Sequence, residues 1–486
     1  MKSLRFSLFV IVLLVLCSCS KRDYVKVIPA DATVVASVNL RSLSEKSDFA
    51  NTALMQMIER VAIDSDVEEW QEYKDNPMAT GIDFMQPMYV FFTQSGQYGV
   101  VVKVGDKGDL EDFFSMLSEE DVASRPTEKK GLMCGTMGGM SYAFNDDALA
   151  LFDGESNVLV RMLESEGESF VDTKAYDKMS EVDGKDIAIY TNLGYLPEMF
   201  QNEFQEYTQN SQLKMSDVEL VASLDFVKGS AVMTAKWWGK TKKAQKVIDE
   251  TKDCLRTIDG SYLDNLPEDL FIWIGTGMKG DKALERIKSN KQAKEALFML
   301  ERGVDVEQMI RSIDGDVSVA IPAYSLNSDD VDVAVWAKLK STSFLDDVDD
   351  WKSSMADYGI SMRNEGKDAY VLSLDGTEIH WGVEGKNLYY ATPNAYRQMK
   401  ADNARSSVLK DYEKEIKKSY YFVFLDLRKT LRDSGNLMLL NGITRNVGIN
   451  LQNLKSIVMR SSAHDEMVLH IDMENDNENF LKQLLK

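Results

Sequence analysis

Residues 29–40 read PADATVVASVNL, and residues 267–276 read PEDLFIWIGT. Both stretches open on Pro-x-Asp and continue into a run of β-branched and aromatic side chains, which is the composition of a β-strand. The second copy begins 238 residues after the first (267 − 29 = 238). A strand-like run that occurs twice, each time after Pro-x-Asp, predicts a fold built from two copies of one module.

Three further blocks return in the same order at offsets of 234 to 236 residues. The matching pairs are the helical patterns that start at Leu110 and Phe344, residues 189–193 with 423–427, and residues 232–235 with 468–471. Such a small drift predicts two related modules. The expected division is a signal peptide at 1–18, a tether at 19–28, a first module at 29–255 and a second module at 256–486.

Hairpins dominate the expected secondary structure. Residues 88–92 and 98–102 are apolar runs on either side of Ser95-Gly96, a turn signal. Helical patterns follow pairs of strands and do not alternate with every strand, as they would around a parallel sheet. We therefore expect an α+β fold with a mainly antiparallel sheet and packed helices in each module. With only 8 prolines and no Ser/Gly-rich linker, the modules are expected to pack closely.

The chain begins with a short apolar segment behind two basic residues, Lys2 and Arg5. Residues 6–16 are apolar except for Ser7, which is typical of a secretory signal peptide. The run is too short to span about 30 Å of hydrocarbon as a permanent helix. It ends on Leu16-Cys17-Ser18-Cys19, which resembles a bacterial lipobox.

Two cysteines compete for the lipid. Cys17 would place a bulky leucine before the cleavage point, whereas Cys19 places the small Ser18 there, so lipidation is predicted at Cys19. An uncleaved anchor, or cleavage without lipid, is the alternative. Acyl chains such as palmitate on one cysteine would hold the protein to a lipid bilayer. Ser20 in place of Asp predicts an outer-membrane destination, and residues 20–23 are too poor in acids for a surface signal, which favours the periplasmic side.

Charge and cysteine content limit the class of protein. Without Lys2 and Arg5 the chain keeps 54 basic and 78 acidic residues, a net charge of −24 (54 − 78). Nucleic acid and anionic lipid surfaces would repel such a protein. No second run of about 18 apolar residues occurs, so no other segment is expected to cross a membrane. Cys134 and Cys254 could pair in an oxidising envelope or remain two separate thiols.

The Pro-Ala-Asp start at residues 29–31, the Val-rich strand ending in Asn39-Leu40, the duplication and the lipobox carry a resemblance. Together they resemble an uncharacterised Bacteroidetes lipoprotein family, domain of unknown function 4836. The resemblance covers most of the mature chain and implies a location in the cell envelope. It supplies no activity and no catalytic residues.

The sharpest local motif is Gly275-Thr276-Gly277-Met278-Lys279-Gly280, behind the strand-like residues 270–274 and with Glu301 about twenty positions on. The spelling matches a dinucleotide-binding turn. Three facts oppose that interpretation: the matching place in the first half has no glycines, no parallel βαβ pattern surrounds the motif, and dinucleotide pools are scarce outside the cytoplasm. We therefore expect a tight strand-to-helix turn and no cofactor.

Metal and catalytic signatures are weak. The three histidines, His380, His464 and His470, lack zinc-ligand spacing, and no Gly-x-Ser-x-Gly elbow occurs. With 78 acids in 486 residues, carboxylate pairs arise by chance and single out no glycosidase dyad. Residues 472–478 carry oxygen ligands but lack the glycine of an EF-hand loop, so an acidic loop before the last helix is expected. No catalytic or metal residue is assigned.

Three aromatic pairs are the best remaining indication of binding: Trp237-Trp238, Tyr389-Tyr390 and Tyr420-Tyr421. Neighbours on a strand point to opposite faces, so one ring of each pair can lie outside the core, unless both faces are covered. An exposed ring could stack on a sugar or mark a protein interface. We predict a non-catalytic binding or assembly module for a protein or glycan partner. The alternative is an enzyme that acts on envelope polysaccharide through acidic residues.

Overall fold

The computed structural model describes residues 23–46, 73, 76–164, 167–195, 213–267, 270–300, 304–322, 331–374, 376–400, 408–428 and 451–485. The leader with Cys17 and Cys19 lies outside these residues, as does Glu301. The chain divides into two compact units, residues 1–191 and 192–486, which we describe separately. Within the described ranges, no helix has the length and apolar character needed to span a bilayer.

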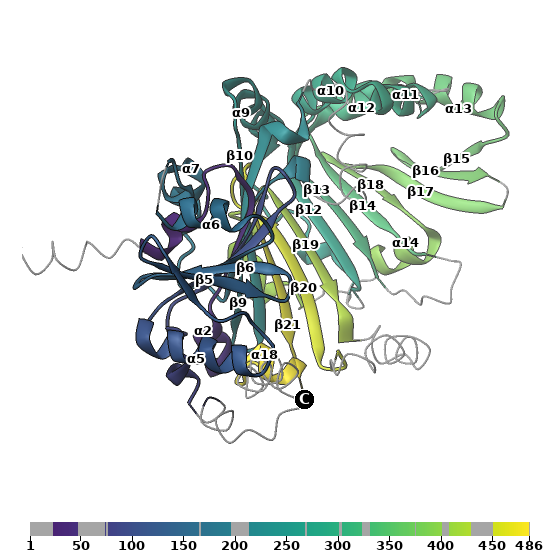
Figure 1. Cartoon of the computed structure of the whole chain (residues 1–486). Helices are drawn as coiled ribbons and strands as arrows, with labels where there is room; N and C mark the ends of the chain where they lie inside the picture. The colour runs from purple at the N-terminus through teal and green to yellow at the C-terminus, as the bar shows by residue number, and fades with distance from the viewer. Residues whose placement is uncertain are drawn as a thin grey trace, which may run out of the picture. The chain divides into compact units, whose positions relative to one another are not determined.

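The first unit is built on an antiparallel sheet (Figure 1). Its described strands lie in the order β8 (Ile187–Asn192), β1 (Ala32–Val38), β2 (Met88–Thr93), β3 (Tyr98–Lys103), β7 (Ala148–Phe152), β6 (Met140–Phe144), β5 (Leu132–Met137) and β4 (Thr127–Lys129). Its helices are α2 (Leu40–Lys46), α5 (Lys107–Glu119), α6 (Ser156–Leu163) and α7 (Lys174–Ser180), with 3₁₀ turns η1 (Asp23–Val27), η2 (Pro77–Thr80) and η3 (Phe170–Asp172).

The hairpin of β2 and β3 confirms the turn predicted at Ser95-Gly96. Gly96 has a φ of 81°, in the left-handed region that glycine enters without a steric penalty. The turn is closed by the Gly96 amide, which donates to the Thr93 carbonyl at 3.0 Å. On the same sheet, Phe114 of α5 stacks on Tyr142 of β6 with ring centroids 4.1 Å apart. Aromatic stacking therefore fixes α5 against the sheet.

The second unit contains a longer antiparallel sheet. Its described strands lie in the order β9 (Val218–Val227), β10 (Ser230–Gly239), β21 (Glu466–Met473), β20 (Leu454–Ser461), β19 (Tyr421–Asp426), β12 (Ile272–Lys279), β13 (Ile313–Ile321), β14 (Ala334–Leu339), β18 (Asn387–Ala391), β17 (Thr377–Glu384), β16 (Ala369–Leu374) and β15 (Ser361–Gly366). The short strand β11 (Leu255–Arg256) pairs with the last part of β12.

The helices of the second unit are distributed along its length. They are α9 (Lys242–Asp249), α10 (Gly280–Ser289), α11 (Lys291–Leu300), α12 (Val306–Ser312), α13 (Val348–Ala356), α14 (Pro393–Lys400), α15 (Glu413–Ile416) and α18 (Phe480–Leu484). The 3₁₀ turns are η4 (Leu193–Tyr195), η5 (Met215–Asp217), η6 (Glu250–Cys254), η7 (Leu263–Asn265), η8 (Ser343–Asp347) and η9 (Lys410–Tyr412). Every described strand pair in both units is antiparallel, so the predicted α+β class with antiparallel sheets is confirmed.

The glycine motif contains the expected tight strand-to-helix turn only at its end, where α10 follows β12 directly at Gly280. Strand β12 continues through Gly275 and Gly277 to Lys279, paired with β13 along its whole length. A side chain on Gly277 would place its Cβ 2.2 Å from the Arg256 carbonyl oxygen of β11. A Cβ on Gly280, the first residue of α10, would lie 1.9 Å from the Ile310 carbonyl oxygen. The glycines therefore allow close approach of backbones, and the strand ends five residues later than expected.

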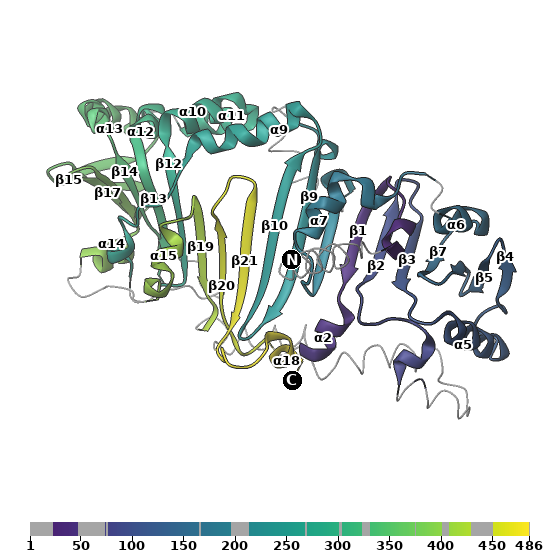
Figure 2. The same cartoon turned by 90° about the vertical axis from the view of Figure 1, so that its left-hand side faces the viewer.

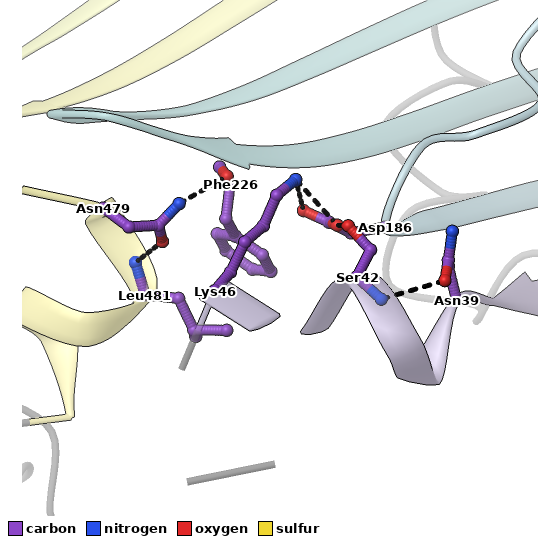
Figure 3. A network of polar contacts seen from close by, with 7 residues as sticks. All are labelled: Asn39, Ser42, Lys46, Asp186, Phe226, Asn479 and Leu481. Carbon is purple, nitrogen blue, oxygen red and sulfur yellow. Dashed lines mark hydrogen bonds and ion pairs between the residues drawn. The ribbon is translucent and has the colours of Figure 1, made fainter. Parts of the chain in front are cut away.

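The Asn39-Leu40 dipeptide marks the junction of β1 with α2 in the first unit (Figure 3). Asn39 caps the helix, because its Oδ1 accepts from the Ser42 amide at 3.0 Å. The fully buried carboxylate of Asp186 accepts from Ser42 Oγ at 2.6 Å and from Lys46 Nζ at 2.8 Å. A buried charge needs a partner, so these contacts hold α2 against the residue that precedes β8.

Asparagine has a similar role at the end of the second unit (Figure 3). Asn479 Oδ1 accepts from the Leu481 amide at 2.9 Å at the start of α18. Its Nδ2 donates to the Phe226 carbonyl of β9 at 2.8 Å. The side chain thus caps α18 and ties it to the end of the β9–β10 hairpin.

One face of the second unit's sheet carries its main core. Trp273 of β12, Phe422 and Phe424 of β19, and Val458 of β20 are buried there, under α14 and residues 409–416. The Trp273 indole donates to Ser318 Oγ at 2.8 Å, which satisfies its polar atom. This face fixes the register of the central strands.

Candidate functional site

The opposite face of the same sheet is also apolar, but it is only half covered. Along β12 and β19, the buried Trp273, Phe422 and Phe424 alternate with the half-buried Ile274 and Val423. An antiparallel sheet with one face in water normally places polar side chains on that face. Here the positions on the half-covered face, such as Ile274 and Val423, are as apolar as those on the covered face.

Side chains on this face form a continuous row across nine strands, which we call the apolar row. In order along the sheet, its members are Leu224, Met233, Leu469, Met459, Val423, Ile274, Val319, Val335 and Tyr390. All are half-buried except Tyr390, which is 36% exposed. With about 4.8 Å between strands, the row is about 38 Å long. An exposed apolar patch of this extent is typical of an interaction surface.

Helices contact this face only near the two ends of the strands, as far as the described residues go (Figure 2). At one end, Ile248 of α9 packs against Leu220 of β9 and Trp237 of β10. At the other end, Phe480 of α18 packs against Ala231 of β10 and Met473 of β21. The apolar row lies between these two clusters, except that its first member, Leu224, packs against the cluster of α18.

A cleft of about 600 Å³ continues the apolar face toward α10. Its lining includes Val247, Leu255, Thr276, Met278, Ala283 and Ile287. Arg286 also lines it, is exposed, and forms no ion pair with any other described residue. The cleft would accept apolar side chains at the end of the row, with a cation available at its edge.

The predicted aromatic pairs have different environments. Tyr389 is buried at 4% exposure, whereas Tyr390 lies in the apolar row. Trp237 and Trp238 both pack into the protein, and the Trp238 indole donates to Glu219 Oε2 at 2.8 Å. The Tyr420-Tyr421 pair is half-buried at the start of β19. By strand register Trp237 and Tyr421 lie on the same face as Tyr390, but both are half-buried, and Tyr390 is the exposed ring among the three pairs.

The histidines lie at three separate places. His380 of β17 stacks on Tyr396 with centroids 4.1 Å apart, and its Nδ1 lies 2.8 Å from Glu365 Oε2. His464 lies in the turn between β20 and β21, and His470 lies on β21. Among the described residues, no group of histidines, cysteines and acids is arranged to hold a metal ion.

The acidic segment 472–478 leaves β21 and leads into α18, as expected. Its carbonyls have protein partners: Gln483 Nε2 donates to the carbonyls of Asn475 at 2.7 Å and Glu478 at 2.9 Å. The two described cysteines are free thiols, Cys134 buried and Cys254 half-buried. Burial raises the pKa of both thiols.

The apolar row was missed at the level of sequence. The available signal is that residues 270–274, 422–425 and 457–459 are continuous apolar runs within an antiparallel fold. Such runs are expected of strands covered on both faces. In strands whose second face has little cover, they indicate a binding surface.

The fold and this surface define an α+β protein built on antiparallel sheets with a partly exposed apolar face. Residues 24–473 match the family model described as Domain of unknown function (DUF4836). The chain belongs to this family, which is the family that the sequence resembled. No curated protein matches the chain.

Solved structures of TP0453 are similar to part of the chain. Crystal form III is 11% identical over 48% of this chain and 86% of that chain, with a TM-score of 0.28. Form IV is 11% identical over 44% and 79%, and form I is 12% identical over 46% and 82%, each with a TM-score of 0.27. Scores of this size establish no shared fold and carry no functional argument.

Proposed function

We propose that the protein is a lipid-anchored cell-envelope lipoprotein that acts as a non-catalytic binding or assembly module. Its partner is a protein that docks on the apolar row. The observation that carries this proposal is the unbroken apolar register across nine strands, from Leu224 to Tyr390. Covering such a face removes apolar surface from water, which is the main driving force of protein association.

The chemistry of the row favours a protein over a glycan. Eight of its nine side chains carry no strong hydrogen-bonding group, whereas a sugar needs donors and acceptors for its hydroxyls. The acidic excess of the chain, with a net charge of −22, favours a basic partner. The same charge disfavours a second copy of the chain and an anionic lipid surface. The expected partner therefore offers an apolar segment in a basic surrounding.

Photocrosslinking in the native envelope tests the docking surface. Benzoylphenylalanine placed at Met459, in the middle of the row, is expected to form an adduct with a basic protein. The matched control replaces Tyr358, which is 54% exposed outside the row, and is expected to give no such adduct. Leu469→Gln, across the strand pair from Met459, is expected to lower the adduct several-fold while the melting temperature changes little. Adducts with lipid or a second copy, or equal adducts at Tyr358, would overturn the proposal.

We place the lipid on Cys19 and the protein on the periplasmic side of the outer membrane. The support is the sequence of the leader alone. Cys19→Ala is expected to abolish labelling with a clickable fatty acid, whereas Cys17→Ala retains it. Protease treatment of intact cells distinguishes the two faces, because only a surface-exposed chain would be cleaved.

We also propose that residues 29–255 and 256–486 are two copies of one module. The order β8-β1-β2-β3-β7-β6-β5-β4 has its counterpart in β19-β12-β13-β14-β18-β17-β16-β15, strand for strand. A hairpin and a helix then close each copy, β9–β10 with α9 and β20–β21 with α18. Equal order of this many elements supports duplication, because independent folds rarely share one strand permutation.

A further inference from the structure

The cleft of about 600 Å³ beside α10 can be reached by a ligand along its whole lining. Its floor includes the face of β12 that also carries Ile274 of the apolar row, and its walls come from α9, η6, α10 and the start of α11 (Figure 2). Every lining residue is half-buried or exposed, so a ligand can contact each of them. Volumes of this size are typical of small-molecule sites.

The apolar part of the lining comes from four elements. Met278 of β12 lies opposite Leu255 of β11, so both side chains are on the same face of the strand pair. Ala283 and Ile287 are four residues apart on α10 and share one side of that helix, and Val247 is added by α9. An apolar cavity of about 150 Å³ holds benzene, so a cleft of about 600 Å³ has room for a chain of about ten or more carbon atoms.

The lining also carries a positive charge that no described residue neutralises. Its acid, Glu250, is paired with Lys246 of α9 at 3.7 Å, and this leaves the exposed Arg286 of α10 without an ion pair in the described ranges. The other charged side chains of α10 all form ion pairs, which are Asp281–Lys340, Lys282–Glu285 and Lys288–Glu307. A ligand with a negative group would therefore find a free cation at Arg286.

A second hydrogen-bond donor lies one helical turn from Arg286. Asn290 Oδ1 accepts from the Ala293 amide at 3.0 Å, which caps α11. The Asn290 Nδ2 has no partner among the residues that the structure describes, and the side chain lines the cleft together with Arg286. A guanidinium binds a carboxylate through two parallel hydrogen bonds, and an amide N–H can donate a third. These two side chains thus suit a carboxylate.

We propose that this cleft binds a free fatty acid. The acyl chain lies against Leu255, Met278 and Ile287, where each buried methylene adds to the affinity. The carboxylate is held by Arg286 and Asn290. An uncharged chain would leave the guanidinium without a partner, and a small anion would leave the apolar floor uncovered. The proposal does not depend on a protein partner at the apolar row.

Binding is tested with decanoate. Decanol, which has the same chain without the charge, and acetate, which has the carboxylate without the chain, are the controls. The protein is residues 20–486, which lack Cys17 and Cys19 and keep two thiols. Cys254 lines the cleft, whereas Cys134 is buried in the first unit. The readouts are calorimetry and the rate of maleimide labelling at each cysteine, followed by mass spectrometry.

Decanoate is expected to bind, to slow the labelling of Cys254 several-fold and to leave the rate at Cys134 unchanged. Decanol and acetate are expected to bind at least fivefold more weakly. Equal binding of decanol or of acetate, or unprotected Cys254 at millimolar decanoate, would overturn the proposal. Protection of Cys254 by a docked protein and not by decanoate would overturn it too, and would assign the cleft to the protein interface.

Two variants test the role of the free cation. Arg286→Gln is expected to weaken decanoate binding about tenfold, because it removes a charge-assisted contact, and to leave decanol binding unchanged. The matched control Lys288→Gln removes one positive charge from the same helix outside the lining, so it should bind decanoate as the parent does. Both side chains are exposed, and the melting temperature should change little in either variant. Equal affinities of the two variants for decanoate would refute the assignment of Arg286.

Discussion

Gly277→Ala tests whether the glycine motif serves the packing of backbones. The added Cβ would lie 2.2 Å from the Arg256 carbonyl oxygen and 2.8 Å from its carbonyl carbon, far inside the 3.5–4.0 Å of favourable contact. Because the clashing atoms are backbone, β11 must move away from β12. Overpacking costs about 1–3 kcal/mol, and the loss of a β11–β12 hydrogen bond adds about 1 kcal/mol. We expect the second unit to lose about 2–4 kcal/mol.

Urea unfolding followed by tryptophan fluorescence measures this loss. All described tryptophans lie in the second unit, and Trp273 is buried on the same strand as Gly277. With a slope of about 3 kcal/mol per molar urea, the midpoint should fall by about 1 M. Met278→Leu, the next residue and a volume-conserving change on the other face, should cost less than about 1 kcal/mol. If Gly277→Ala unfolds within about 0.5 kcal/mol of the parent, the close approach of β11 does not explain the glycine.

Three further predictions concern buried groups. Asp186→Asn should cost the first unit about 2–3 kcal/mol, because it removes the charge-assisted hydrogen bonds from Ser42 and Lys46 to a buried carboxylate. The loss should appear as faster hydrogen exchange in β1 and β8, and unchanged exchange would contradict it. Ellman's reagent should react slowly with native Cys134 and Cys254 at pH 7, with Cys134 slower, and faster as the pH rises, because burial raises both thiol pKa values; rapid labelling of Cys134 at pH 7 would refute this. Burial lowers the pKa of His470 below 6.5, so the unfolded chain takes up the proton first and stability should fall as the pH drops below 6.5. His470→Gln should make that decline shallower in unfolding experiments between pH 7.5 and 5, and an identical slope would count against the assignment.

Local patterns were enough to predict the fold class and the β2–β3 hairpin. Ser95-Gly96 sets a turn whatever the rest of the chain does, because Gly96 takes a positive φ that few other residues adopt. The predicted position of the turn in residues 275–280 was wrong, because these glycines are required by contacts that are not local in sequence. The need for Gly277 and Gly280 comes from Arg256 and Ile310, which are distant in sequence and whose carbonyls approach only after folding. The sequence therefore predicted that the strand ends before Gly275, whereas the glycines lie within the strand and allow its close pairing.

The candidate surface was harder to predict than the fold. Tyr390 could be singled out from the sequence, because the two rings of an aromatic pair on a strand point to opposite faces. The other members of the row, such as Ile274 and Met459, are ordinary apolar residues in apolar runs. A shift of one residue in register would move them to the covered face. Only the observed pairing, in which Ile274 faces Val423 and Val423 faces Met459, assembles them into one surface.

The proposed duplication predicts a particular pairing register between β10 and β21. If two copies meet through equivalent strands about a local twofold axis, one residue must face its own counterpart and the flanking pairs must exchange. Met233 faces Leu469, 236 residues on, which is the offset of these two blocks. The flanking pairs, Val232 with His470 and Thr234 with Val468, exchange as required. The apolar row passes through this central pair. The proposal therefore assigns the strands on one side of the pair to the first copy and those on the other side to the second. On the proposed duplication, this surface is longer than one copy could build.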